Sequence, residues 1–124
     1  MAKRILIIDD EELIIKTLSK LLEKEKYDVV VAKNGQDAII MMEEEQFDLI
    51  ISDIRMPGIN GVETIKSIQG ALQKNNAKKV PVIFITGYAD QDIEKAARDL
   101  TPVDYIYKPF DIVDLLDKIK KAVG

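Results

Sequence analysis

Five short, mostly apolar runs alternate along the chain with longer segments in which apolar residues recur every three or four positions. The runs lie at 5–8, 28–32, 48–53, 80–85 and 103–107. Apolar runs of this length, rich in β-branched residues, are typical of strands that are covered on both faces. The periodic segments predict amphipathic helices. The predicted inner faces of these helices consist of Ile14, Leu18, Leu21 and Leu22; Ala38, Ile39 and Met42; Val62, Ile65, Ile68 and Leu72; Ile93, Ala96, Ala97 and Leu100; and Ile112, Leu115, Leu116, Ile119 and Val123.

The connections between these segments are short and carry turn-forming and helix-capping residues. Asn34-Gly35, Pro57-Gly58 and Asn60-Gly61 predict breaks in the chain, and Asp111 is a suitable cap for the last helix. Five strand–helix repeats joined in this way predict a doubly wound α/β fold, in which a parallel five-stranded sheet lies between two layers of helices. The polar stretch 74–79 is interpreted as a loop, so residues 1–124 are expected to form one domain.

Polar side chains appear where the apolar strands end. Asp9 and Asp10 follow the first strand, Asp53 ends the third, Thr86 the fourth, and Lys108 follows the fifth. In open α/β sheets, ligands bind outside the carboxyl ends of the strands. These five side chains are therefore expected to meet at one edge of the sheet.

The chemistry of this set favours a divalent cation and phosphoryl transfer. At about 4 Å and an effective dielectric near 20, each carboxylate–carboxylate contact costs roughly 4 kcal/mol, so three acids at one site call for a cation. A cluster of carboxylate oxygens suits Mg²⁺ or Mn²⁺. A carboxylate beside the metal, Asp53, can act as a nucleophile toward phosphorus. Lys108 and Thr86 would then contact the transferred group, and Lys108 is expected to pair with Asp53 at rest.

Composition narrows the chemistry further. Hydrophobic residues make up 47% and charged residues 32% of the 124 residues, as in ordinary globular domains, and the net charge of −4 gives no general attraction to nucleic acid. With no histidine and no cysteine, serine–histidine catalysis, phosphohistidine on this chain and thiolate metal sites are excluded. No stretch approaches the roughly 18 apolar residues of a membrane helix, and the N-terminal segment is too short and acidic for a signal peptide. We therefore expect a cytoplasmic protein that does not contact membranes.

Four motifs, one at each of four strand ends, together resemble the receiver domain of two-component response regulators. They are Ile-Ile-Asp9-Asp10-Glu, Ser-Asp53-Ile-Arg-Met-Pro-Gly, Ile-Thr86-Gly and Tyr-Lys108-Pro-Phe. The resemblance covers essentially the whole chain. It implies a (βα)5 flavodoxin-like, three-layer sandwich in which the parallel sheet has the strand order 2-1-3-4-5.

The resemblance also implies roles for the acidic residues. Asp53 matches the phosphoacceptor. Asp10 matches the residue that contacts Mg²⁺ directly, Asp9 matches a neighbour that acts through water, and the backbone carbonyl of Arg55 matches the remaining protein ligand. In this interpretation the metal site consists of Asp9, Asp10, Asp53 and Arg55.

Further roles follow from the same resemblance. Thr86 and Lys108 match the hydroxyl and lysine that contact the phosphoryl group. Tyr105 matches an aromatic switch residue that turns inward as Thr86 moves, although Tyr105 also suits plain core packing. The Lys108–Pro109 bond matches one that is commonly cis. The implied partners are a sensor histidine kinase or histidine phosphotransfer protein as donor, and a downstream protein bound by the fourth helix, fifth strand and fifth helix.

Two features depart from the family pattern or vary within it. Many members have Gly-Ala shortly before the fifth strand, where this chain has Thr101-Pro102-Val103, so the shape of that loop is open. Arg55 and Tyr88 occupy variable positions that tune dephosphorylation. Their bulk predicts limited access of water and a moderately long-lived phosphoryl state.

The motifs favour a phosphorylation-gated binding module, which is not an enzyme beyond its own phosphorylation and dephosphorylation, over three other classes of protein. A Mg²⁺-dependent aspartyl phosphatase would carry a second acid two residues after the nucleophile, where this chain has Arg55. A flavodoxin-like cofactor carrier would need a glycine- and hydroxyl-rich phosphate loop, whereas the acids at 9–12 repel phosphate. An unphosphorylated scaffold has no need of the complete acidic set.

Overall fold

The computed structural model describes residues 2–124 and contains ten regular elements in strict strand–helix alternation. The strands are β1 (Arg4–Ile8), β2 (Asp28–Ala32), β3 (Leu49–Ser52), β4 (Val82–Thr86) and β5 (Asp104–Tyr107). The helices are α1 (Glu12–Lys24), α2 (Gly35–Glu44), α3 (Gly61–Lys74), α4 (Gln91–Arg98) and α5 (Ile112–Val123). No helix within residues 2–124 combines the length and the apolar character that crossing a membrane requires.

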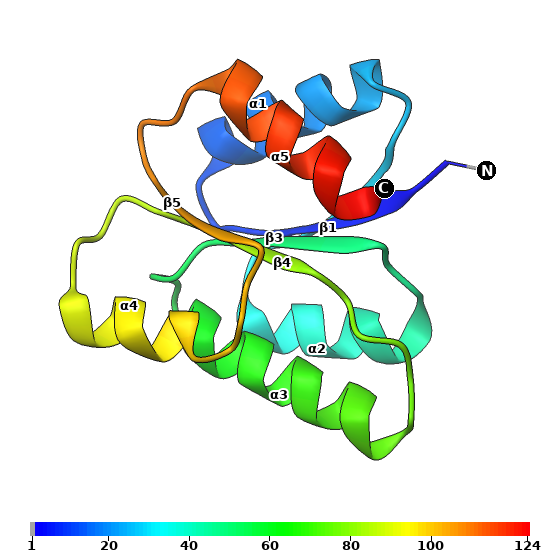
Figure 1. Cartoon of the computed structure of the whole chain (residues 1–124), viewed down its shortest axis with the longest axis vertical. Helices are drawn as coiled ribbons and strands as arrows, with labels where there is room; N and C mark the ends of the chain where they lie inside the picture. Colours follow the sequence, from blue (N-terminus) through cyan, green and yellow to red (C-terminus); the bar gives the residue numbers. More distant parts are fainter. Residues whose placement is uncertain (1) are drawn as a thin grey trace.

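The five strands form one parallel sheet in the order β2-β1-β3-β4-β5. Helices α1 and α5 cover one face, and α2, α3 and α4 cover the other (Figure 1). The predicted doubly wound fold and the strand order implied by the resemblance are both confirmed. Since β1 pairs with β2 on one side and β3 on the other, the strand order reverses between β1 and β3, and a ligand site is expected at the carboxyl ends of these two strands.

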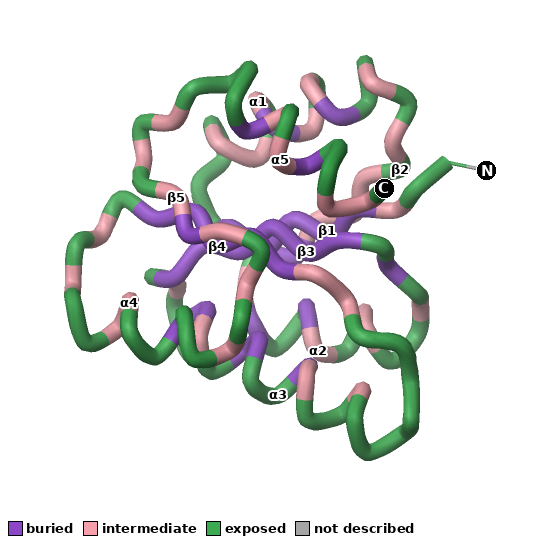
Figure 2. Tube along the Cα trace, in the orientation of Figure 1, coloured by how far each residue is buried: buried purple, intermediate pink, exposed green. Residues whose placement is uncertain are grey.

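The buried residues concentrate on the central strands, with exposed residues along the outer sides of the helices (Figure 2). Successive strand residues point to opposite faces, so β1 supplies Leu6 and Ile8 to the α2–α3–α4 side and Ile5 and Ile7 to the α1–α5 side. All four of these side chains are fully buried. The continuous apolar runs of the sequence are therefore explained by a sheet that is covered twice.

The expected elements all occur, and most of their ends shift by one or two residues. The largest differences are that β4 begins at Val82 rather than at 80, and that Gly35 opens α2 instead of forming a separate turn. A Cβ on Gly35 would lie 2.1 Å from the Thr64 hydroxyl oxygen, so only glycine permits this contact between α2 and α3. Two predicted inner-face residues, Ala96 and Ile112, are exposed because their helices turn those positions to solvent.

Helix N-caps fix the connections that lead from the carboxyl edge of the sheet into α3, α4 and α5. Asn60 accepts a hydrogen bond from the Glu63 amide, and the Glu63 side chain accepts one from the Asn60 amide, which completes a capping box at the start of α3. Asp90 caps α4, and Asp111 caps α5 as predicted. Gly61 packs so closely that a Cβ there would lie 2.0 Å from the Asp53 carbonyl oxygen, so α3 begins directly against the site loop.

The loop before β5, whose shape the sequence left open, turns at Thr101. Thr101 has a φ of 52°, in the left-handed region. Its amide donates to the Arg98 carbonyl at 3.0 Å, and the Val103 amide donates to the Val82 carbonyl at 2.7 Å. The chain therefore enters β5 in register with β4 although no glycine is present at this turn.

Candidate functional site

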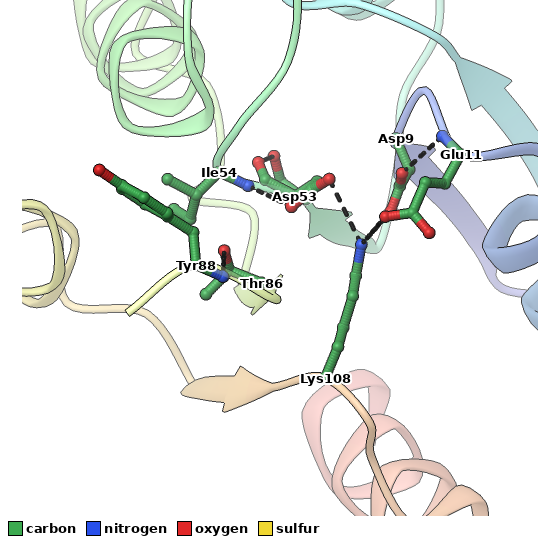
Figure 3. Close-up of polar contacts among 8 residues, drawn as sticks. Asp9, Glu11, Asp53, Ile54, Thr86, Tyr88 and Lys108 are labelled. Atoms are coloured by element: carbon green, nitrogen blue, oxygen red, sulfur yellow. Dashed lines mark hydrogen bonds and ion pairs between the residues drawn. The ribbon is translucent and has the colours of Figure 1, made fainter. Parts of the chain in front are cut away.

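The sheet ladder continues one residue beyond three of the strands and places the candidate side chains together. The Asp9 amide donates to the Ala32 carbonyl at 3.1 Å, the Asp53 amide to the Ile8 carbonyl at 2.8 Å, and the Lys108 amide to the Thr86 carbonyl at 2.7 Å. The backbones of these residues are thus held by strand-type hydrogen bonds, while their side chains project from the carboxyl edge (Figure 3).

Asp9, Asp10 and Asp53 form a compact carboxylate cluster, and one oxygen of each lies within 4.8 Å of the others. Asp9 and Asp53 are only 2% and 5% exposed, whereas Asp10 is open to solvent. Burial, followed by the charge of Asp9, raises the pKa of Asp53 to about 6 despite the opposing effects of Lys108 and the Ile54 amide. Burial likewise raises the pKa of Asp9. The cluster therefore holds poorly solvated negative charge.

Lys108 lies between the two buried aspartates. Its ammonium nitrogen is 3.4 Å from an Asp53 oxygen and 3.4 Å from an Asp9 oxygen, and its side chain is 12% exposed. Burial acts to lower the pKa of Lys108, but the charges of Asp53 and Asp9, together with a contact to Glu11, outweigh burial and raise this pKa. The expected resting ion pair between Lys108 and Asp53 is confirmed.

A third carboxylate on Lys108 was missed by sequence reasoning. The Glu11 side chain lies 3.1 Å from the Lys108 nitrogen, closer than either aspartate. The only sequence signal is its place directly after Asp9-Asp10 in the first motif. A contact between residues 97 positions apart follows from the strand order and not from any local pattern.

Thr86, Tyr88 and Arg55 form the side of the site nearest α4. The Thr86 hydroxyl is buried and accepts a hydrogen bond from the Tyr88 amide at 3.0 Å, and it makes no hydrogen bond to Asp53 within residues 2–124. The Arg55 guanidinium carbon lies 4.2 Å from the centre of the Tyr88 ring, a cation–π contact that joins the loops after β3 and β4. The two bulky side chains noted in the sequence, Arg55 and Tyr88, thus stack on each other.

Tyr105 points inward and is 5% exposed. Its ring packs against Phe84 and Tyr107, with centroid separations of 6.1 and 5.5 Å. Its hydroxyl is buried and has no hydrogen-bond partner among residues 2–124, and burial raises the pKa of this hydroxyl to about 12. Tyr105 therefore lies away from the carboxylate cluster in the core between the sheet and α4.

The residues present fit a divalent cation. Asp9, Asp10 and Asp53 supply only oxygen ligands, and oxygens with excess negative charge are the donors that Mg²⁺ prefers. One carboxylate of the set is exposed and two are buried, so an ion would have an open path to the cluster. Arg55 lies two residues after Asp53 in the same loop, so its backbone is available as a further ligand.

The chain belongs to the response regulator receiver domain family, whose family model matches residues 5–120. It is a receiver domain of the two-component response regulator class, and such domains are signalling domains. The resemblance inferred from the four motifs is confirmed.

Individual relatives agree with this assignment. The sporulation initiation phosphotransferase F of Bacillus subtilis is 32% identical, over 98% of this chain and 94% of that protein. The transcriptional regulatory protein PdtaR of Mycobacterium tuberculosis is 34% identical over 98% of this chain, which spans 57% of PdtaR. A CheY-like receiver domain protein from Methanospirillum hungatei has a crystal structure that superposes with a TM-score of 0.90 at 31% identity, covering 99% of this chain and 94% of that one.

Proposed function

We propose that the protein is a phosphorylation-dependent switch in which Asp53 accepts a phosphoryl group in a Mg²⁺-dependent reaction. The observation that carries the proposal is the position of Asp53: a nearly buried carboxylate that shares one edge with Asp9 and Asp10 and is held by Lys108. Such an arrangement supplies a nucleophile, a cation site and a fixed positive charge, which are the requirements of phosphoryl transfer.

In the proposed step, one Asp53 carboxylate oxygen attacks the phosphorus of a phosphohistidine. The P–N bond breaks, and its electron pair remains on the donor's imidazole nitrogen. Lys108 stabilises charge on the phosphoryl oxygens, and the Thr86 hydroxyl donates to one of them after leaving the Tyr88 amide. A bound Mg²⁺, held by Asp9, Asp10, Asp53 and the Arg55 carbonyl, would neutralise charge on the transferring group.

A phosphohistidine donor must lie outside these 124 residues, because they contain no histidine. We propose a sensor histidine kinase or a histidine phosphotransfer protein as donor, and a cytoplasmic location for the whole system. Residues 1–124 would act as one receiver domain that catalyses only its own phosphorylation and dephosphorylation. No direct binding to nucleic acid or membranes is proposed.

The output is proposed to pass through the face made by α4, β5 and α5. Thr86 and Tyr105 are the proposed switch residues, since Thr86 ends the strand beside β5 and Tyr105 lies within β5. Ion pairs and hydrogen bonds already link this face: Glu94 contacts both Arg98 and Tyr107, and Lys118 contacts Asp104. A movement of Thr86 would therefore be passed to α4, β5 and α5 through these contacts.

Intact-mass measurement tests the proposal. The wild type is incubated with Mg²⁺ and phosphoramidate, a small donor with the P–N bond of phosphohistidine, and Asp53→Asn is treated in parallel. We expect the mass of one phosphoryl group to be added to the wild type only, and only with Mg²⁺ present. Equal labelling of the variant, or none of the wild type, overturns the proposal.

A further inference from the structure

Glu11 contacts the catalytic lysine from outside the buried cluster. Lys108 has three N–H donors, and three carboxylates surround them: Asp9 and Asp53 at 3.4 Å and Glu11 at 3.1 Å (Figure 3). The Glu11 side chain is 57% exposed, while those of Asp9 and Asp53 are 4% and 6% exposed. Glu11 is thus the nearest of the three partners and the one that water can reach.

The local position of Glu11 indicates that its side chain is committed to Lys108. Glu11 occupies the N-cap of α1 with extended backbone, yet its carboxylate makes no capping hydrogen bond. Short side chains such as Asp or Ser are favoured there because they reach the free amides of the first turn. The Glu11 amide instead donates to an Asp9 oxygen at 2.9 Å, which orients this turn, and the longer side chain extends to Lys108.

Phosphorylation changes the competition for Lys108. A phosphoryl group on Asp53 brings three strong acceptor oxygens and additional negative charge. The phosphoryl oxygens take over the Lys108 N–H that now faces Asp53, and any further donation to them must come from the N–H groups that face Asp9 and Glu11. Releasing buried Asp9 would leave a carboxylate without solvation, whereas released Glu11 is solvated at once. The exchange therefore favours release of Glu11.

We propose that Glu11 is a positioning residue that restrains Lys108 in the unphosphorylated protein and competes with the phosphoryl group for its ammonium. This role rests on the proposed phosphorylation of Asp53, which Glu11 would regulate. The contact between Glu11 and Lys108 disfavours the phosphorylated state, so a variant that weakens this contact should favour that state.

Three variants distinguish the effect of the Glu11–Lys108 contact from the effect of the negative charge at position 11. Glu11→Gln removes the charge. Glu11→Asp keeps the charge but is one methylene shorter and suits the cap of α1, so it leaves Lys108. Glu12→Gln is the matched control, since this neighbouring acid pairs with Lys33 and not with Lys108.

The readout is binding of beryllofluoride, a tetrahedral mimic of the phosphoryl group, followed by ¹⁹F NMR in the presence of Mg²⁺. We expect Glu11→Gln and Glu11→Asp each to lower the half-saturating concentration by about threefold, as for loss of one half-exposed ion pair. Glu12→Gln should match the wild type. In the free protein, ¹⁵N NMR should show faster solvent exchange of the Lys108 ammonium in both Glu11 variants.

The role of Glu11 is overturned if Glu11→Asp binds the mimic like the wild type, if Glu12→Gln reproduces the effect of Glu11→Gln, or if none of the variants differs. Failure of the proposed function looks different. In that case the wild type itself binds no beryllofluoride, while the exchange rate of the Lys108 ammonium still reports whether Glu11 holds it.

Discussion

At the scale of single residues, the site stores unfavourable charge in the folded protein. Asp53 and Asp9 are nearly buried, and the pKa values of both carboxyls are raised mainly by burial. Lys108 offsets this only in part, since it is shared among three acids. A cation or a phosphoryl group therefore meets a site that is already oriented and short of positive charge.

The raised pKa of Asp53 predicts that Asp53→Asn stabilises the metal-free protein. Since the pKa of about 6 exceeds the unfolded value, ionised Asp53 destabilises the fold above that pH, and protonation relieves this as the pH falls toward 4. We expect the free energy of unfolding of the variant to exceed that of the wild type by about 2 kcal/mol at pH 7. At pH 5 this gain should be smaller by roughly 1 kcal/mol. Urea unfolding in EDTA at both pH values measures it. A variant less stable than wild type at pH 7 contradicts the expected charge repulsion.

The Arg55–Tyr88 pair predicts slow loss of the phosphoryl group. The two side chains stack across the loops after β3 and β4, and their bulk is expected to limit the approach of water to Asp53. Arg55→Ala and Tyr88→Ala should each speed hydrolysis of the acyl phosphate about two- to fivefold, the scale of one cation–π contact. Decay is followed by intact mass after removal of the donor. Unchanged decay in both variants, or rapid decay of wild type, counts against a protective stack.

At the scale of elements, two helices end in the same way with different residues. After α1, the Tyr27 amide donates to the Leu22 carbonyl at 3.1 Å, with Lys26 at a φ of 71°. After α3, the Ala77 amide donates to the Leu72 carbonyl at 2.8 Å, with Asn76 at a φ of 54°. These are Schellman-type ends, in which glycine is favoured and asparagine is tolerated.

Lys26→Gly is therefore expected to stabilise the fold by about 0.5–1 kcal/mol, because relief of the left-handed strain exceeds the added freedom of the unfolded chain. Asn76→Gly is the matched control and should stay within about 0.5 kcal/mol of wild type, since asparagine already tolerates this conformation. Denaturant unfolding of the two variants decides the matter. Equal effects at both positions would show that the residue type at the helix end is unimportant.

The elements themselves were largely predictable, for a physical reason. A sheet covered on both faces demands continuous apolar strands, and such runs stand out in the sequence. The ends of elements were less certain because they depend on neighbours. Gly35 opens α2 rather than forming a turn because Thr64 packs against it, and Ala96 faces solvent because only one side of α4 meets the core.

At the scale of the whole molecule, the site exists only because distant segments meet. Asp9, Asp10, Asp53 and Lys108 were predictable as a set, because parallel strands end at a common edge. Glu11 on Lys108 and the stacking of Arg55 on Tyr88 were not, since they depend on side-chain reach across loops. Strand order places residues near one another, and packing decides which of them touch.

A divalent cation at this edge should stabilise the whole fold. Because the ion would bind only the folded state, a magnesium concentration about tenfold above the dissociation constant should raise the free energy of unfolding by about 1.4 kcal/mol. This corresponds to a few degrees in Tm. Thermal unfolding in MgCl₂ and in NaCl of equal ionic strength measures this. Asp10→Asn replaces the exposed carboxylate of the cluster with a neutral amide and should lose most of the shift. An equal shift in Asp10→Asn, or none in the wild type, places the ion elsewhere or excludes it.

The central claim is that Asp53 itself carries the phosphoryl group. After labelling with phosphoramidate and Mg²⁺, borohydride reduction converts an aspartyl phosphate to homoserine, and trypsin releases residues 34–55 as one peptide. Tandem mass spectrometry of that peptide should find homoserine at position 53 in labelled protein and aspartate there when Mg²⁺ is omitted. Homoserine at another acidic position, or unmodified Asp53 in protein that has gained phosphoryl mass, contradicts the account.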